Sequence, residues 1–350
     1  MDGSPLHVLG RLADLSGRQG LEALRDRLSA LEALVRGDLR ELDAALMALV
    51  GCEGPVGHSV RHLLGRAGKR LRPICVLLAA RLGRGVDERT RQLAVAVELV
   101  HAATLLHDDV VDGGEQRRGV PSARVLWGNA ASIFAGDWLL VEALRRVRAT
   151  GLDDLLDALL AVVDEMIQAE ALQLAHRGDL EPDLERWLRV AEGKTASLFR
   201  WAVRAGGRAG GLDPLALGAL DAYGRHLGVA FQIVDDVLDL AAHQAPTGKS
   251  ALSDLREGKI NFPVALAMRR NPEVRSILGR WVESTAGRDA LDEDPRELLE
   301  AVIETGSVRD SLAEARRRVD GALEALEALR PGPARDALCT AAHAALARCA

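Results

Sequence analysis

One acidic motif occurs twice in this chain, each time at the end of a long apolar run. Asp108-Asp109-Val110-Val111-Asp112 follows residues 93–107, and Asp235-Asp236-Val237-Leu238-Asp239 follows residues 215–234. Both runs are typical of helices, so the first and last Asp of each motif are expected on one helical face. Carboxylates without His or Cys suit Mg²⁺, which shares its remaining coordination positions with phosphate oxygens. The two motifs therefore predict two opposed carboxylate faces that bind a diphosphate through Mg²⁺.

Basic residues surround the acidic motifs. They lie in five short segments: Gly68-Lys69-Arg70-Leu71-Arg72-Pro73, Arg117-Arg118-Gly119, Gly193-Lys194-Thr195, Gly248-Lys249 and Gly258-Lys259. Arg offers phosphate a planar set of donors, and Lys offers a mobile charge. The chain has a formal net charge of -6. Cations placed beside carboxylates in such a chain indicate an anion held through metal, and they argue against nucleic acid binding.

Composition favours a helical protein of one large domain or two. The chain has 350 residues, only 3% of them aromatic, and no Val- or Ile-rich alternating segment bounded by turn residues. We therefore predict an all-α bundle of roughly a dozen helices with essentially no sheet. Asp213 before Pro214 marks one helix start. In residues 1–40, leucines three or four apart predict an amphipathic helix that packs on the body or on a partner subunit.

Several kinds of segment are absent from the sequence. No run of about 18 apolar residues is present, and the N-terminus lacks a charged start followed by an apolar core. We expect neither a transmembrane helix nor a secretory signal. The four cysteines form no CxxC pair, which argues against a zinc site and a disulfide framework. A cytoplasmic location is the natural expectation.

Taken together, these residues resemble the trans-isoprenyl diphosphate synthases of the polyprenyl synthetase family, from about Leu42 to the C-terminus. Eight strings carry the resemblance: GKRLRP (68–73), ELVHAATLLHDDVVD (98–112), RRGVPSARVLWGN (117–129), AGDWLL (135–140), EALQL (170–174), GKTASLF (193–199), YGRHLGVAFQIVDDVLDL (223–240) and GKSALSDLREGKINFP (248–263). The resemblance implies a single domain over residues 1–350, with the all-α isoprenoid synthase bundle around a central cavity. It also implies a homodimer whose interface includes part of residues 129–144.

The same resemblance implies how a site would work. Mg²⁺, at about three ions per active site, would bind Asp108, Asp112 and Asp235. The implied catalytic residues are the carboxylates of both motifs and two lysines: Asp108, Asp109, Asp112, Asp235, Asp236, Asp239, Lys194 and Lys259. An allylic prenyl diphosphate would contact Lys194, Lys259 and Arg117, with Thr195, Gln232 and Lys249 as further substrate-binding residues. Isopentenyl diphosphate would be held by Lys69, Arg72, His101 and Arg118.

The implied reaction is a head-to-tail trans condensation of the two diphosphates. Ala103, Val100 and Ala96 would line a tunnel before the first motif, and none is bulky, so we expect a long-chain product of the octaprenyl type. A short-chain farnesyl or geranylgeranyl diphosphate synthase is the alternative. A terpene cyclase would have no need of the isopentenyl site, and a regulatory subunit of a heteromeric synthase would show eroded acidic motifs.

Other residues have structural or open interpretations. His107 is expected to pack in the core, Gln232 either orients a carboxylate or bonds to backbone, and Glu170 with Gln173 is expected to brace neighbouring helices. The tryptophans are all expected to pack: Trp127, Trp138, Trp187, Trp201 and Trp281. Three positions depart from the family pattern and are expected to alter loop closure without loss of activity: Ala67, Leu252 and Asn261.

Overall fold

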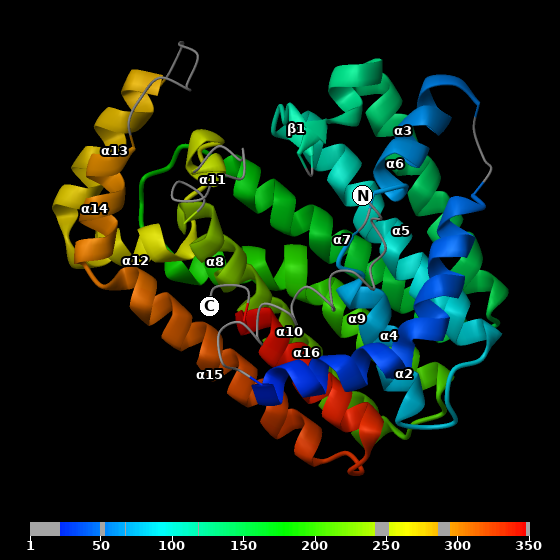
Figure 1. Cartoon of the computed structure of the whole chain (residues 1–350). Coiled ribbons are helices and arrows are strands. Elements are labelled where there is room, and N and C mark those ends of the chain that lie inside the picture. Colours follow the sequence, from blue (N-terminus) through cyan, green and yellow to red (C-terminus); the bar gives the residue numbers. More distant parts are fainter. Residues whose placement is uncertain are drawn as a thin grey trace. The chain divides into compact units, whose positions relative to one another are not determined.

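The computed structural model of the chain describes residues 22–49, 53–66, 68–117, 119–241, 252–285 and 295–347 (Figure 1). Over these residues the elements are α2 (Glu22–Met47), α3 (Gly54–Leu64), α4 (Leu71–Arg81), α5 (Glu88–Val111), β1 (Gln116–Arg117), β2 (Val120–Pro121), α6 (Ala123–Ala149), α7 (Asp153–Ala175), α8 (Leu184–Ala191), the π-helix η1 (Glu192–Ala196), α9 (Ser197–Ala209), α10 (Pro214–Ala241), α11 (Ser253–Arg256), α12 (Phe262–Arg270), α13 (Pro272–Thr285), α14 (Arg296–Glu304), α15 (Ser307–Glu327) and α16 (Pro333–Leu346). The two strands pair with each other in antiparallel orientation. The prediction of an all-α fold is confirmed.

The chain divides into two compact units. Unit 1 holds the described residues within 1–161, 198–224 and 323–344, and unit 2 holds those within 162–197, 225–322 and 345–350. The expectation of one domain over residues 1–350 stays a prediction. Across the described ranges, no helix is long and apolar enough to cross a membrane.

Helix α5 in unit 1 carries the first acidic motif at its C-terminal end. It begins at a capping box in which the Asp87 side chain accepts a 2.8 Å hydrogen bond from the backbone N–H of Thr90. It contacts α2, α4 and α6, and Leu93, Val97 and Leu99 are fully buried. Because neighbouring helices cover α5 on several sides, its middle stretch, residues 93–106, is mainly apolar on more than one face.

Helix α2 packs an apolar stripe against α3, α4 and α5. Leu28, Leu31, Val35, Leu39 and Leu42 recur every three or four residues and are all buried, which is the spacing of one helical face. The part of the expected N-terminal helix before Glu22 lies outside the described residues.

Glycine allows α9 to lie very close to α4 in unit 1. A Cβ at Gly206 would lie 2.0 Å from the carbonyl oxygen of Val76, and one at Gly210 would lie 2.6 Å from that of Ala80. No side chain fits at either position, so the backbone of α9, and of Gly210 just after it, meets the backbone of α4 directly.

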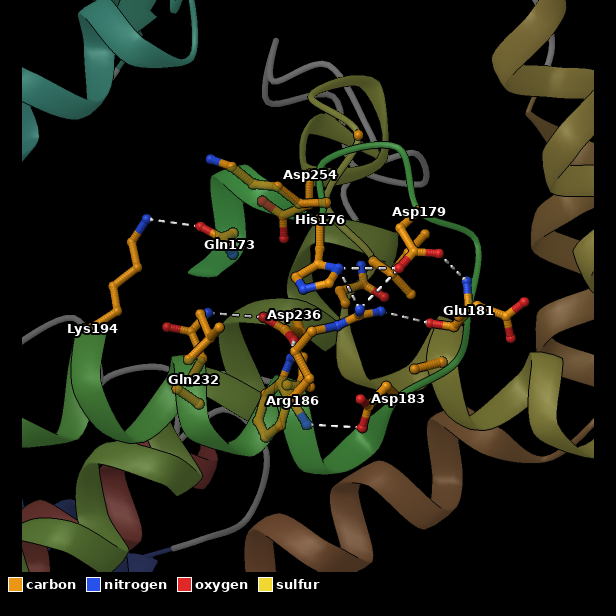
Figure 2. Close-up of a pocket in the computed structure, with 18 residues that line it drawn as sticks. Gln173, His176, Asp179, Glu181, Asp183, Arg186, Lys194, Gln232, Asp236 and Asp254 are labelled. Atoms are coloured by element: carbon orange, nitrogen blue, oxygen red, sulfur yellow. Dashed lines mark hydrogen bonds and ion pairs between the residues drawn. The ribbon is translucent and has the colours of Figure 1, made fainter. Parts of the chain in front are cut away.

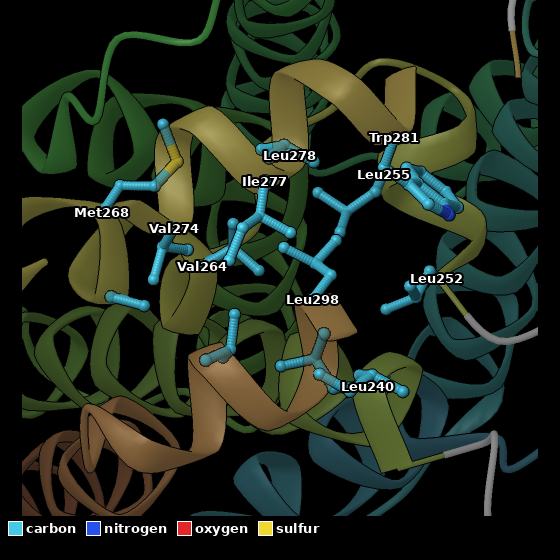
Figure 3. Close-up of a cluster of buried hydrophobic side chains, with 13 residues drawn as sticks. Leu240, Leu252, Leu255, Val264, Met268, Val274, Ile277, Leu278, Trp281 and Leu298 are labelled. Atoms are coloured by element: carbon cyan, nitrogen blue, oxygen red, sulfur yellow. The ribbon is translucent and has the colours of Figure 1, made fainter. Parts of the chain in front are cut away.

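A hydrophobic cluster in unit 2 joins α11, α12, α13 and α14 to the end of α10 (Figure 3). Leu255, Val264, Leu278 and Leu298 point toward one another in this cluster, and Leu252 joins them with no exposed surface. Leu252 has φ 60° and ψ 35°, a left-handed conformation that favours glycine. The departure from the family pattern at this position therefore places a strained leucine in the core.

Candidate active site

The first acidic motif ends α5 with one buried and two partly exposed carboxylates. Asp109 is 1% exposed, whereas Asp108 and Asp112 are only partly buried. Arg117 on β1 donates through Nε to Oδ1 of Asp109 at 2.8 Å. Its Nη2 lies 2.6 Å from the same oxygen. Burial raises the pKa of the Asp109 carboxyl, and the Arg117 charge opposes that rise. Asp109 thus orients Arg117 and leaves Asp108 and Asp112 on the more accessible side of the helix end.

Helix α6 holds the turn of α5 that precedes Asp108. Ser132 donates to the carbonyl of Leu106 at 2.8 Å, and Nε2 of His107 donates to the carbonyl of Ile133 at 3.2 Å. The same Nε2 lies 3.2 Å from Oδ1 of Asp137. The His107 side chain is 34% exposed, so the expectation from sequence that it packs in the core is wrong; its hydrogen bond instead fixes the backbone next to Asp108.

The segment Gly68–Pro73 separates its basic residues into different environments. Arg70 is buried, has φ 49°, and forms ion pairs with Glu98 and Asp43. Lys69 is exposed, and the Arg72 guanidinium lies over the Phe199 ring at 4.5 Å from its centroid. Arg70 is thus a structural cation that the sequence did not distinguish from its neighbours.

The second acidic motif, on α10, also has one buried and two partly exposed carboxylates. Asp236 is 2% exposed, while Asp235 and Asp239 are partly buried. Three groups donate to the Asp236 carboxylate: Nε1 of Trp187 at 2.8 Å, the backbone N–H of Phe262 at 2.8 Å, and Nε2 of Gln232 at 2.9 Å. Burial raises the pKa of Asp236 to about 7, although the three donors oppose the rise and the nearby Asp235 adds to it.

Asp239 binds the start of α11. Its Oδ1 accepts from the backbone N–H of Ser253 at 3.1 Å and from the Ser253 hydroxyl at 2.6 Å, and its Oδ2 accepts from the N–H of Asp254 at 3.4 Å. Burial, together with Asp239 and Asp236, raises the pKa of the Asp254 carboxyl well above its usual range. The last Asp of this motif therefore tethers the loop that carries Lys259.

Lys194 and Thr195 lie on the π-helix η1. Lys194 pairs with Glu170 and donates to Gln173 at 3.3 Å. Thr195 donates to Oε1 of Gln232 at 2.7 Å, which leaves Nε2 of Gln232 to donate to Asp236. Gln232 therefore orients a carboxylate, the first of its two interpretations. Glu170 and Gln173 link α7 to η1 through Lys194.

A pocket of about 180 Å³ in unit 2 brings several of these side chains together (Figure 2). Lys194, Gln232, Asp236 and Lys259 all line it. Lys259 pairs with Glu257 at 2.8 Å, and the N–H of Gly178 donates to the carbonyl of Gly258 at 2.8 Å. The connection between α7 and α8 therefore holds the loop on which Lys259 lies.

Sequence reasoning missed part of this pocket. Arg186 donates to Nδ1 of His176 at 2.7 Å and to Asp179 at 2.9 Å, and none of the three stood out in the sequence. Asn261 caps α12 by accepting from the N–H of Val264, so its departure from the family pattern is a helix cap. Trp187, read only as a packing residue, is also a hydrogen-bond donor.

The predicted site residues fall into two sets. Unit 1 contains Asp108, Asp109, Asp112, Arg117, Lys69, Arg72, His101 and the buried α5 residues Ala96, Val100 and Ala103. Unit 2 contains Asp235, Asp236, Asp239, Lys194, Thr195, Gln232 and Lys259. Arg118 and Lys249 lie outside the described residues. In the part of the chain that the structure describes, no group of three or more His, Cys, Asp or Glu side chains lies together as metal ligands.

Comparison with known proteins defines the class. Residues 55–299 match the family model Polyprenyl synthetase. Octaprenyl diphosphate synthase from Escherichia coli (strain K12) is 33% identical over 323 residues, covering 92% of this chain and 99% of that protein. The crystal structure of a polyprenyl synthase from Caulobacter crescentus, complexed with calcium and isoprenyl diphosphate, superposes with a TM-score of 0.85 at 34% identity and covers 91% of this chain and 97% of that one. A decaprenyl diphosphate synthase from Rhodobacter capsulatus gives a TM-score of 0.82 at 34% identity, over 90% of this chain and 97% of that one.

The fold is therefore the all-α isoprenoid synthase fold, and the chain belongs to the polyprenyl synthetase family. It is a prenyltransferase, a trans-polyprenyl diphosphate synthase.

Proposed function

We propose that this enzyme condenses isopentenyl diphosphate with an allylic prenyl diphosphate, head to tail, to make a long-chain polyprenyl diphosphate. The observation that carries the proposal is the shared design of the two acidic motifs. In each, the second Asp is buried and hydrogen-bonded within the protein, while the first is partly exposed. Each motif thus leaves a partly exposed carboxylate available to a cation, next to a buried carboxylate that the protein itself holds.

The proposed metal ligands are Asp108, Asp112 and Asp235. Their donor set consists of carboxylate oxygens, which fits a hard divalent cation such as Mg²⁺. A relative from Caulobacter crescentus was crystallised with calcium and isoprenyl diphosphate, which supports a divalent cation beside the diphosphate. When bound, Mg²⁺, at about three ions per site, would neutralise charge on the departing diphosphate.

The basic residues would divide between two diphosphates. Lys194, Lys259 and Arg117 would contact the allylic diphosphate, with Thr195, Gln232 and Lys249 nearby in this proposal. Arg117 contacts Asp109 through Nε and Nη2, and a guanidinium carries five N–H donors, so further donors are available for a phosphate oxygen. Isopentenyl diphosphate would be bound by Lys69, Arg72, His101 and Arg118.

The reaction needs no protein nucleophile. The carbon–oxygen bond of the allylic diphosphate ionises to an allylic carbocation, with the positive side chains stabilising the leaving group. The double bond of isopentenyl diphosphate then attacks the cation, and a proton is lost to the released diphosphate. Exclusion of water matters because water would otherwise capture the cation.

The proposed product is long, of the octaprenyl type. Ala103, Val100 and Ala96 are small or medium residues on one stretch of α5 and all are buried, so no bulky side chain at these positions would end chain growth. The E. coli relative is an octaprenyl diphosphate synthase. A second candidate is a short-chain product, because a relative from Methanothermobacter thermautotrophicus at 35% identity is a short chain isoprenyl diphosphate synthase.

A homodimer is part of the proposal. Helix α6 exposes several large apolar side chains, with exposed fractions of 61% for Phe134, 52% for Val125 and 45% for Val141. Exposed apolar residues gathered on one helix are typical of an interface, and the expected contact covers part of residues 129–144. A dimeric mass in light scattering at micromolar protein is the expected result, and a monomeric mass would contradict it.

Two aspartate variants test the reaction. Asp108→Ala and Asp235→Ala should each lower turnover by roughly 10² to 10³-fold or more, the scale of one lost electrostatic group. The assay uses labelled isopentenyl diphosphate, each common allylic primer and product sizing. Asp154→Ala is the matched control, because Asp154 is 53% exposed and pairs only with Arg208 in the described structure. Near-normal turnover in either folded motif variant would overturn the proposal.

A further inference from the structure

Asp236 is held by three separate elements of unit 2. Trp187 reaches it from α8, the Phe262 N–H from the first turn of α12, and Gln232 from one turn earlier on α10. Trp187 and Phe262 donate to the same oxygen, Oδ2, and Gln232 donates to Oδ1. Figure 2 shows the link between Gln232 and Asp236 at one side of the pocket. The carboxylate therefore has little freedom to rotate.

Trp187 is itself fixed in place. Its ring lies 4.7 Å from the ring of Phe262, tilted by 56°, and both residues pack against a hydrophobic cluster that includes Ile233 and Val234. Helix α8 starts at a cap in which Asp183 accepts from the N–H of Arg186 at 2.9 Å. An indole N–H held this firmly can donate in one direction only, which is toward Asp236.

Fixing Asp236 also fixes the direction of the residue beside it. Consecutive residues in an α-helix are about 100° apart around the axis. Asp236 faces α8 and α12, so Asp235 must face a neighbouring sector of α10, where it is partly exposed. A rotation of α10 that moved Asp235 would break the hydrogen bond from Trp187.

We propose that Trp187 is a positioning residue for prenyl transfer: through its indole N–H on Asp236, supported by the Phe262 ring, it sets the direction in which Asp235 presents its carboxylate to metal and diphosphate. This inference rests on the proposed function, because it takes Asp235 as a metal ligand. Residues that orient a metal ligand from behind typically change metal affinity or activity by about 10-fold to 100-fold when they are removed.

The decisive variant is Trp187→Phe, which keeps an aromatic ring and removes the donor. The readouts are the Mg²⁺ concentration for half-maximal turnover and the calorimetric affinity of the whole enzyme for inorganic pyrophosphate in the presence of Mg²⁺. We expect the half-maximal Mg²⁺ concentration to rise by about tenfold and pyrophosphate to bind correspondingly more weakly. The Michaelis constant for isopentenyl diphosphate should change far less, because Lys69 and Arg72 belong to unit 1.

Trp201→Phe is the matched control. Trp201 is 2% exposed and donates through Nε1 to the carbonyl of Leu155 at 3.1 Å, so the same substitution removes the same kind of hydrogen bond away from the acidic motif. It should lower the melting temperature and leave the Mg²⁺ dependence unchanged. Phe262→Leu gives a second, milder test, because it removes the ring beside Trp187 and keeps the backbone donor to Asp236.

The outcomes separate this inference from the proposed function. A normal Mg²⁺ dependence in both Trp187→Phe and Phe262→Leu, with only a loss of thermal stability like that of Trp201→Phe, would overturn the positioning role. Asp235→Asn reports on the proposed function instead. If Asp235→Asn keeps normal Mg²⁺-dependent pyrophosphate binding, Asp235 is not a metal ligand. The proposal that Trp187 acts by positioning Asp235 is then wrong as well.

Discussion

The imidazole ring of His107 occupies the space that a side chain at Gly136 would need. A Cβ at Gly136 would lie 2.3 Å from Nε2 of His107, well inside van der Waals contact. Gly136 is on α6 and His107 immediately precedes Asp108 on α5. The absence of a side chain at one position thus allows the hydrogen bond that fixes the turn before the first acidic motif.

Gly136→Ala should therefore displace His107 and the turn that carries Asp108. We expect a loss of about 1–3 kcal/mol in the free energy of unfolding, the usual cost of overpacking, together with reduced turnover. Gly218→Ala is the matched control, because Gly218 is helical and a Cβ there meets nothing within 4 Å. It should stabilise the protein by about 0.5–1 kcal/mol. Chemical denaturation and turnover measure both, and unchanged turnover in a folded Gly136→Ala would contradict the prediction.

Ala103→Phe tests the proposed tunnel. Ala103 is 3% exposed on α5, and a close-packed cavity cannot absorb a phenyl ring by a small shift. Product length should fall toward the farnesyl or geranylgeranyl level while the first condensation continues. Ala96→Phe lies seven residues further from the motif, about 10 Å along the helix, and should permit longer products than Ala103→Phe. Products of unchanged length from both variants would rule out a tunnel along this stretch of α5.

Leu252 combines a strained backbone with a buried side chain, and the two effects have opposite signs. Leu252→Gly relieves about 1–2 kcal/mol of left-handed strain but loses burial that is typically worth about 2–5 kcal/mol, so it should destabilise. Leu252→Ala keeps the strain and loses the burial, so it should destabilise more. At Leu278, in the same cluster but inside α13, the order should reverse, because Gly costs about 1 kcal/mol more than Ala in a helix. Denaturation curves of the four variants measure their free energies of unfolding. If the Gly and Ala variants rank in the same order at Leu252 and at Leu278, the prediction is wrong.

Asp236 makes stability depend on pH. Its pKa is raised to about 7 in the folded chain, against about 3.9 in an unfolded one. Between these values the folded state binds a proton that the unfolded state lacks, so the free energy of unfolding falls as pH rises from about 4 to about 7. Asp236→Asn removes this titration, and Gln232 can turn its amide to suit the new side chain. As pH rises over that range, the free energy of unfolding of Asp236→Asn should therefore increase relative to that of the unmodified protein.

Thermal melts of the metal-free protein across this pH range measure the effect. Asp154→Asn, at an exposed position, is the control and should follow the curve of the unmodified protein. Parallel curves for the Asp236 variant and the unmodified protein would show that Asp236 is charged in the fold at all these pH values.

Much of the fold followed from local sequence patterns. Periodic leucines predicted α2, and Asp213 before Pro214 predicted the start of α10 at Pro214. The all-α class and the family were predicted correctly from composition and from eight quoted strings. Helix periodicity and helix caps involve residues only a few positions apart, so these elements can be recognised in the chain itself.

Tertiary structure decided which charged residues of these motifs are buried and which partners they bind. In the string Gly68–Pro73 nothing marked Arg70 as the buried cation, because its partner Glu98 lies 28 residues away. Asp236 and Asp239 look alike in sequence, yet one accepts from Trp187, 49 residues earlier, and the other binds the start of α11. Sequence alone determined which residues carry charge and on which elements they lie. Which carboxylate is buried, and which donors hold it, depends on helices packing together over long sequence distances, so only the folded chain could decide it.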